Sequence, residues 1–186
     1  MMQHPGAFAA RLRRDQKGVA AVEFALVAPV LILFYFGLAE ATQATMAERK
    51  TIRLASSIGD IVAQRNAWTN TELNDVFAMG EVLMRPYPAT TELKICVASL
   101  VASPGPNSVK TVAWVKKHNA PADCPNKGDP ATVSSDLLGA NQSVIMSKVS
   151  YTYTGPTSKV IDINPTFTKT FYLRPRLTHS ITCATC

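Results

Sequence analysis

Few residues of this 186-residue sequence have the type and spacing that chemistry requires. Catalysis needs a nucleophile or base with a partner in reach, but the three histidines, His4, His118 and His179, are widely separated. Cys124 lies near His118, yet a cysteine in a proline-rich loop favours a disulfide over a Cys–His pair. The sequence contains no G-x-S-x-G, P-loop or H-E-x-x-H motif. We therefore expect neither an enzyme nor a cofactor.

The other candidates for chemistry are the four cysteines, at Cys96, Cys124, Cys183 and Cys186. An even number in an oxidising compartment favours disulfides, and four cysteines allow three pairings. We favour Cys183 with Cys186, which are close enough to form a tight ring, and Cys96 with Cys124, although the sequence does not decide among the pairings. A zinc site is the alternative, but there is one C-x-x-C motif rather than two, and the histidines lack ligand spacing. We expect no metal.

Glu23 is the only charged residue in the 21-residue apolar run 19–39. At about 1.5 Å per residue the run forms about 31 Å of helix, enough to cross a bilayer. A charged side chain there costs about 3 kcal/mol on insertion scales, and ionisable residues within membranes are usually functional. If the chain began at Val19, its cationic α-amine would pair with Glu23 of an axially staggered neighbour. Alternatively, Glu23 lies at the membrane edge and snorkels to the headgroups.

The residues before the apolar run are basic. They carry four basic side chains and one acid, and so supply +3 of the net charge of +6. Because cationic flanks stay on the inner side of the membrane, we predict a cytoplasmic N-terminus and an exported remainder. The remainder is only weakly basic, which argues against a nucleic-acid partner.

Three fates of the apolar run are open. The first is a signal peptide that is cleaved after Ala41, and the second is an uncleaved membrane anchor. The third is cleavage on the cytoplasmic side after Gly18, which makes the apolar run the new N-terminus. The run is longer than the apolar core of a signal peptide, which has about 7–15 residues. Glu23 favours the third fate, because cleavage after Gly18 would create the amine that it needs. Pro29 removes one backbone hydrogen bond and is expected to bend or loosen the helix.

Residues 18–30, with the sequence G-V-A-A-V-E-F-A-L-V-A-P-V, resemble the N-terminus of TadE-like pseudopilins of the bacterial Tad (tight adherence, Flp-type) pilus. In that family an aspartyl prepilin peptidase cuts after the glycine, and a glutamate and an aromatic residue occupy positions five and six of the mature chain. Glu23 and Phe24 match both positions. Residues 170–183 also resemble the end of some family members.

The resemblance implies a minor pilin that is inserted in the bacterial inner membrane with its C-terminal domain in the periplasm. It would be cut between Gly18 and Val19 and take part in pilus assembly, adhesion and biofilm formation. The implied partners are the prepilin peptidase, the major and other minor pilins, the inner-membrane assembly platform and the bilayer. The alternatives are an uncleaved membrane scaffold of the pilus machinery and a secreted binding protein released after Ala41.

The helical period continues beyond the apolar run. It recurs at Met46, Leu54, Ile58, Ile61 and Val62 and predicts one helix over about residues 18–65. We expect a sheet to cover this apolar stripe, with a partner helix as the alternative. A capping box at Thr69 and Glu72 predicts a second helix ended by the prolines at 86 and 88. Its predicted apolar face comprises Leu73, Val76, Phe77, Gly80 and Leu83.

The remaining chain alternates with the period of strands. We predict a half-buried strand at 93–98, a partner at 109–116 with Val112 and Trp114 on one face, and further strands at 145–153 and 167–173. Pro175 should make the far end of the last strand an edge or an extended tail. A disulfide should pin the loop 118–140, and residues 160–163 should form a crossover or short helix. The predicted organisation is a leader (1–18), a transmembrane segment (19–40) and a head (41–186). The fold class is α+β, with a long pilin-like helix packed on a small, mostly antiparallel sheet of about four strands.

Overall fold

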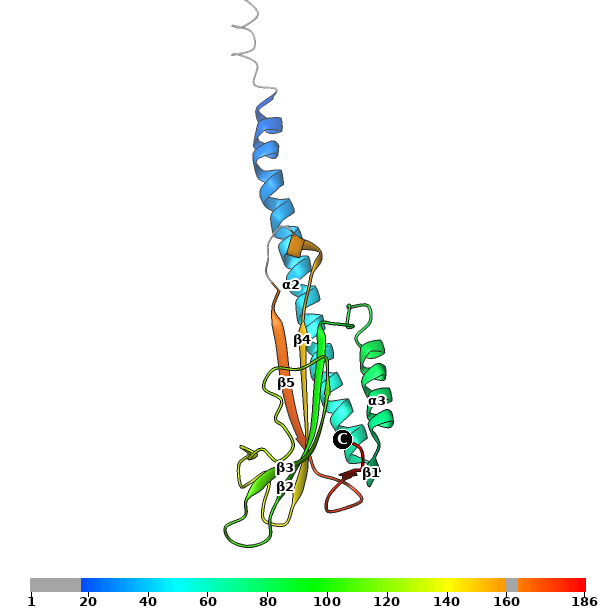
Figure 1. Cartoon of the computed structure of the whole chain (residues 1–186). Coiled ribbons are helices and arrows are strands. Elements are labelled where there is room, and N and C mark those ends of the chain that lie inside the picture. The colour runs from blue at the N-terminus through cyan, green and yellow to red at the C-terminus, as the bar shows by residue number, and fades with distance from the viewer. Residues whose placement is uncertain (1–17, 160–163) are drawn as a thin grey trace, which may run out of the picture. The chain divides into compact units, whose positions relative to one another are not determined.

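The computed structural model describes residues 18–159 and 164–186 (Figure 1). The predicted basic leader and the predicted crossover at 160–163 lie outside the described residues. The chain divides into two units, Met1–Thr42 and Gln43–Cys186, and we call the second the head. Helix α2 (Val19–Ala63) belongs to both, which confirms the single long helix predicted over about residues 18–65.

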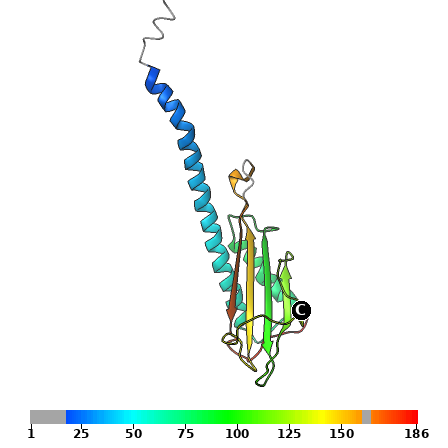
Figure 2. The same cartoon turned by 90° about the vertical axis from the view of Figure 1, so that its left-hand side faces the viewer.

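The described residues of the head form one further α-helix and a four-stranded antiparallel sheet, which confirms the α+β class. The elements are α3 (Asn70–Leu83), β2 (Leu93–Ala102), β3 (Lys110–His118), β4 (Ser143–Thr152) and β5 (Thr166–Leu173). The strand order is β3-β2-β4-β5, so β5 is an edge strand, in agreement with the edge or tail predicted at its far end. Figure 2 shows the strands side by side, with α3 behind the sheet. A short 3-10 helix, η2 (Pro156–Lys159), follows β4.

A two-stranded parallel ribbon, which the sequence did not predict, joins β1 (Ala67–Trp68) to β6 (Thr182–Cys183). Two-residue strands have no alternation to detect, and here the C-terminal segment provides the context. Its backbone is tied down by hydrogen bonds from Arg176 N to Ala63 O (3.0 Å) and from Trp114 Nε1 to Ile181 O (2.7 Å). The C-terminal segment thus connects the end of α2 to the sheet.

The second half of α2 packs against the head through one stripe. Its buried residues are Ala47, Thr51, Leu54, Ala55, Ile58, Gly59, Val62 and Ala63. The prediction is therefore correct for Leu54, Ile58 and Val62. It is wrong for Met46, which is 51% exposed, because the stripe passes through Ala47, about 100° further round the helix.

Helix α3 begins with the predicted capping box. Thr69 N donates to Glu72 Oε2 (2.9 Å), and Glu72 N donates to Thr69 Oγ1 (3.3 Å). The hydrogen bonds from Thr69 lower the pKa of Glu72, and the neighbouring Arg65 acts in the same direction. At the other end the predicted burial of Leu83 is wrong: it is 50% exposed, and the fully buried Met84 closes the apolar face instead.

Strand β2 is buried on both faces, which corrects the prediction of a half-buried strand. Leu93, Ile95 and Val97 pack in the cluster beneath the helices. Cys96 and Leu100, on the opposite face, belong to a second cluster that includes residues of the 119–142 loop. We call this opposite side the outer face. It is buried because the loop, pinned by a disulfide, covers it.

Val112 and Trp114 belong to different faces of β3, contrary to the prediction. Ser99 pairs with Trp114, but Leu100 pairs with Val112, so the register shifts by one residue. A β-bulge puts two residues of one strand against one of its partner and reverses the alternation beyond it. Val112 therefore joins the outer cluster and Trp114 the inner one.

Gly59 marks the closest approach of α2 to the sheet. A Cβ at this position would overlap Leu173 Cδ1 of β5 and lie 3.1 Å from Ser147 Cβ of β4. At Gly37 of the same helix, a Cβ would meet no described atom within 4 Å. What is a weak helix former in the sequence is thus a packing requirement in the fold.

We expect Gly59→Ala to destabilise the head by about 1–2 kcal/mol, because overpacking outweighs the gain of about 1 kcal/mol in helix propensity. The measurement is urea unfolding of the full chain in detergent, followed by the fluorescence of its two tryptophans, which both lie in the head. Gly37→Ala is the matched control and should leave this transition unchanged. Unfolding of Gly59→Ala at the wild-type urea concentration would contradict the close contact.

Candidate functional site

The candidate site lies at the start of α2. The helix begins at Val19, directly after Gly18. The first four N–H groups of a helix lack intrahelical acceptors, so the N–H of Val22 is the first that can reach back, to the carbonyl of Gly18. Residues four apart share one helix face. The fold therefore places the predicted new N-terminus and the carboxylate of Glu23 one turn apart on the same face.

The side chains of this segment are exposed. Val19 is 51% exposed and Phe24, the next residue after Glu23, is 71% exposed. Among the described residues, α2 is the single helix that is long and apolar enough to cross a membrane, and none of its apolar window is buried in the structure. An apolar surface left uncovered in this way indicates a membrane or protein partner. The N-terminal half of α2 is thus a candidate membrane span.

Two local features bear on the regularity of this helical segment. Helix α2 continues through Pro29, where the missing N–H leaves the carbonyl of Ala25 without its usual donor; the bend expected there stays a prediction. Thr42 Oγ1 donates to Leu38 O (2.8 Å), which satisfies this hydroxyl within the helix.

The electrostatics at the start of α2 favour an anion. The helix macrodipole places partial positive charge at the N-terminus, where a carboxylate is stabilised by about 0.3–1 kcal/mol. Cleavage after Gly18 would add the full charge of an α-amine one turn from Glu23. The arrangement can therefore form an ion pair, within one chain or between staggered chains.

The four cysteines form the two favoured disulfides, Cys96–Cys124 and Cys183–Cys186, and no cysteine is free. The Cα atoms are 5.9 and 5.5 Å apart, respectively. Cys96–Cys124 joins β2 to the 119–142 loop, and the bonded Cys124 cannot act as the nucleophile of a Cys–His pair. Nowhere in residues 18–159 and 164–186 do three or more histidine, cysteine or acidic side chains gather in a way that suits a metal ion.

The histidines also lie apart in the structure. His118 ends β3, and its Nε2 lies 3.0 Å from Glu81 Oε1 on α3. His179 belongs to the C-terminal segment, where its carbonyl accepts a hydrogen bond from the Ser143 hydroxyl. His4 is outside the described residues. The two described histidines thus make separate contacts that tie elements of the head together.

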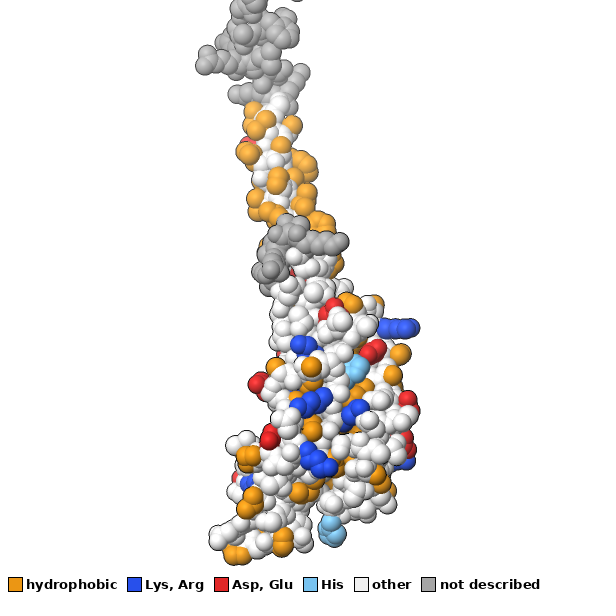
Figure 3. All heavy atoms as spheres, in the orientation of Figure 1, with side chains coloured by type: hydrophobic (Ala, Val, Ile, Leu, Met, Phe, Trp, Pro, Cys, Tyr) orange, Lys and Arg blue, Asp and Glu red, His pale blue; other side chains and the backbone are white. Residues whose placement is uncertain are grey.

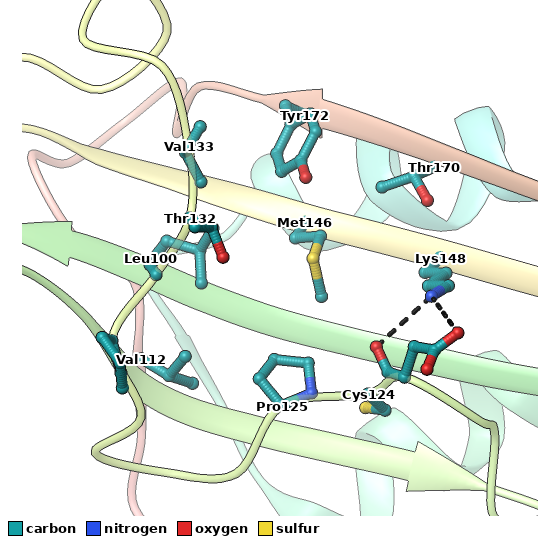
Figure 4. A pocket seen from close by; sticks show the side chains of 13 residues that line it. Leu100, Val112, Cys124, Pro125, Thr132, Val133, Met146, Lys148, Thr170 and Tyr172 are labelled. Atoms are coloured by element: carbon teal, nitrogen blue, oxygen red, sulfur yellow. Dashed lines mark hydrogen bonds and ion pairs between the residues drawn. The ribbon is translucent and has the colours of Figure 1, made fainter.

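A groove on the outer face is the feature that the sequence analysis missed. Its volume is about 390 Å³, and Figure 4 shows Leu100 and Met146 on the sheet, Thr170 and Tyr172 on β5, and Lys148 at one end. The 119–142 loop forms the opposite wall. The T-x-T-x-T alternation of residues 166–170 was a signal for this surface, but the bulge and the loop that shape it are not readable from periodicity.

The fold and the site define a class: an α+β protein with one candidate membrane-spanning helix, which begins at a glycine junction and has an acid one turn further on. Residues 18–57 match the model of the family described as TadE-like protein. The TadE-like resemblance is thereby confirmed over these residues, and it supports a protein associated with a Tad pilus. Searches of curated proteins and of solved structures give no match.

Proposed function

We propose that this protein is a minor pilin of a Tad pilus, cut by a prepilin peptidase between Gly18 and Val19. The observation that carries the proposal is the arrangement at the start of α2, where Glu23 lies one turn after the glycine junction on an uncovered apolar helix. The match over residues 18–57 supports it. Phe24 would belong to the peptidase recognition motif.

In this proposal the chain is inserted with its N-terminus in the cytoplasm and its head in the periplasm. Cleavage frees the Val19 amine, and the apolar half of α2 moves from the bilayer into a bundle of pilin helices. There the amine of one subunit pairs with Glu23 of a neighbour, because two charges that are costly alone are tolerated when paired. The head then lies at the filament surface and contributes to assembly, adhesion and biofilm formation.

The test is the intact mass of the mature protein purified from its host. A chain that starts at Val19 supports the proposal. A chain that starts at Met1 or Met2 supports an uncleaved scaffold of the pilus machinery, and one that starts at Thr42 supports a secreted binding protein. A matched control is the Gly18→Ile variant, which should keep its leader and remain in the membrane fraction.

A further inference from the structure

The outer face of the sheet carries a surface that anchoring and assembly do not use. We name it the lysine–hydroxyl surface, and it consists of Lys94, Lys148, Ser150, Thr168 and Thr170. Lys94 pairs with Ser150, Ser150 with Thr168, and Lys148 with Thr170. Cross-strand partners share a face, and neighbouring strands lie about 4.8 Å apart. Because Lys148 also pairs with Cys96 of the outer cluster, the whole set lies on the outer face.

The positive charge of this face is held in place but little neutralised. Lys117 Nζ donates to Asn126 Oδ1 (2.8 Å) and Lys110 Nζ to Val133 O (2.6 Å), which are neutral acceptors. Lys148 Nζ lies 3.3 Å from Asp123 O and 3.7 Å from its carboxylate, which is 88% exposed. Lys94 has no hydrogen-bond or ion-pair partner among the described residues. Figure 3, which views the sheet nearly edge-on rather than onto the outer face, shows Lys and Arg side chains among Asp and Glu side chains on the head.

The hydroxyl groups add a regular set of hydrogen-bonding partners. Ser150 Oγ lies 2.9 Å from Thr168 Oγ1, and Thr152 Oγ1 lies 3.0 Å from Thr166 Oγ1, and both pairs are exposed. Each hydroxyl has one donor and two acceptor positions, so these contacts leave capacity for a ligand. The surface thus combines the ammonium groups of Lys94 and Lys148 with hydroxyl groups that can form further hydrogen bonds.

The surface continues into the groove of about 390 Å³, which lies in the size range of small-molecule sites. Lys148 and Thr170 line both, and the groove adds the apolar side chain of Met146 and the ring of Tyr172, which is 37% exposed. Figure 4 shows Lys148, Thr170 and Tyr172 around this opening. A ligand with a carboxylate, several hydroxyls and one apolar ring face matches these groups.

We propose that the lysine–hydroxyl surface and the groove bind an acidic polysaccharide, with uronate carboxylates at Lys94 and Lys148. Sugar hydroxyls would meet Ser150, Thr168 and Thr170, and one ring would lie against Tyr172. An extended peptide fits less well, because β2 and β4 are inner strands whose backbone is already paired. Duplex DNA fits less well, because its affinity comes from many phosphate contacts, whereas the lysine–hydroxyl surface has two lysines and the rest of the outer face adds Lys110 and Lys117. This binding goes beyond the proposed role in assembly.

The test is the binding of polygalacturonate to the full chain in detergent, measured by calorimetry at low and high salt. We expect Lys94→Gln/Lys148→Gln to weaken binding about tenfold, the sum of two charge contacts at the protein surface. Arg53→Gln, which removes one charge from an exposed site on α2, is the control and should bind like the wild type. Fully methyl-esterified polygalacturonate should bind at least about tenfold more weakly, because it lacks the carboxylates.

A second variant separates hydroxyl recognition from charge and does not depend on Lys148. Thr168→Val/Thr170→Val keeps both lysines and suits an exposed strand; we expect it to weaken polygalacturonate binding while leaving the weak binding of polyglutamate unchanged. Three results would overturn the proposal. They are wild-type affinity in both double variants, equal binding of the esterified polymer, and tighter binding of polyglutamate or duplex DNA than of polygalacturonate.

Discussion

We expect the Glu23→Ala protein to enter the membrane to the same extent as the wild type but to be missing from sheared pili. The reason is the position of Glu23 at the start of α2. Removing the only charge of the run 19–39 makes the helix more apolar, so insertion is preserved. Packing among other pilin helices would then leave the Val19 amine unpaired. Breaking a buried ion pair in this way costs about 3–5 kcal/mol, which corresponds to at least about a hundredfold loss of incorporation.

The measurement is the ratio of this protein in sheared pili to that in the membrane fraction, by quantitative immunoblot. Glu23→Gln should fail like Glu23→Ala, because it keeps the shape and loses the charge. Glu40→Ala, at the other end of the apolar run, is the matched control and should be incorporated normally. Intact mass of each variant shows whether cleavage after Gly18 still occurs and so separates assembly from processing. Wild-type incorporation of correctly cleaved Glu23→Gln protein would refute the ion pair.

Local signals in the sequence were sufficient for much of the fold. The capping box at Thr69 and Glu72 placed the start of α3, and the uninterrupted helical period gave α2 as one element. The errors occur where tertiary contacts decide. Met46 is placed in the buried stripe by its apolar side chain, whereas in the structure the neighbouring Ala47 is buried and Met46 is exposed. Gly59 is a weak helix former by intrinsic propensity, although the sheet leaves little space for a side chain at this position.

One part of the candidate sites could be predicted from the sequence, namely the start of α2, whereas the groove could not. The junction at Gly18, the acid at Glu23 and the apolar run are consecutive in the sequence, so their placement on one helix follows directly from helical geometry. The groove on the outer face is assembled from four strands and a loop. Its shape depends on the bulge between Val112 and Trp114 and on the position of Cys124. Periodicity reports neither, because both arise from long-range pairing.

The disulfide Cys96–Cys124 is expected to be the larger covalent contribution to the stability of the head. It closes a separation of 28 residues, against 3 for Cys183–Cys186. Loop-closure entropy then gives about 3–4 kcal/mol for the first bond and about 2 kcal/mol for the second. Cys96→Ala/Cys124→Ala should accordingly lower the free energy of unfolding about twice as much as Cys183→Ala/Cys186→Ala, its matched control. Urea unfolding of both variants under non-reducing conditions measures the difference.

Cys96→Ala/Cys124→Ala should also loosen the 119–142 loop on the outer face, an effect that is separate from the loop-closure entropy of the disulfide. Cys96 is fully buried, and the loop that Cys124 anchors covers Leu100 and Met146 and positions the ammonium groups of Lys117 and Lys148. Without the bond, the loop is held by hydrogen bonds worth about 0.5–1.5 kcal/mol each. We therefore expect faster amide hydrogen exchange in Cys96→Ala/Cys124→Ala, both in residues 119–142 and in the strands that this loop covers. Exchange in α3 should change little. Equal exchange in the loop of variant and wild type would show that packing alone holds it on the sheet.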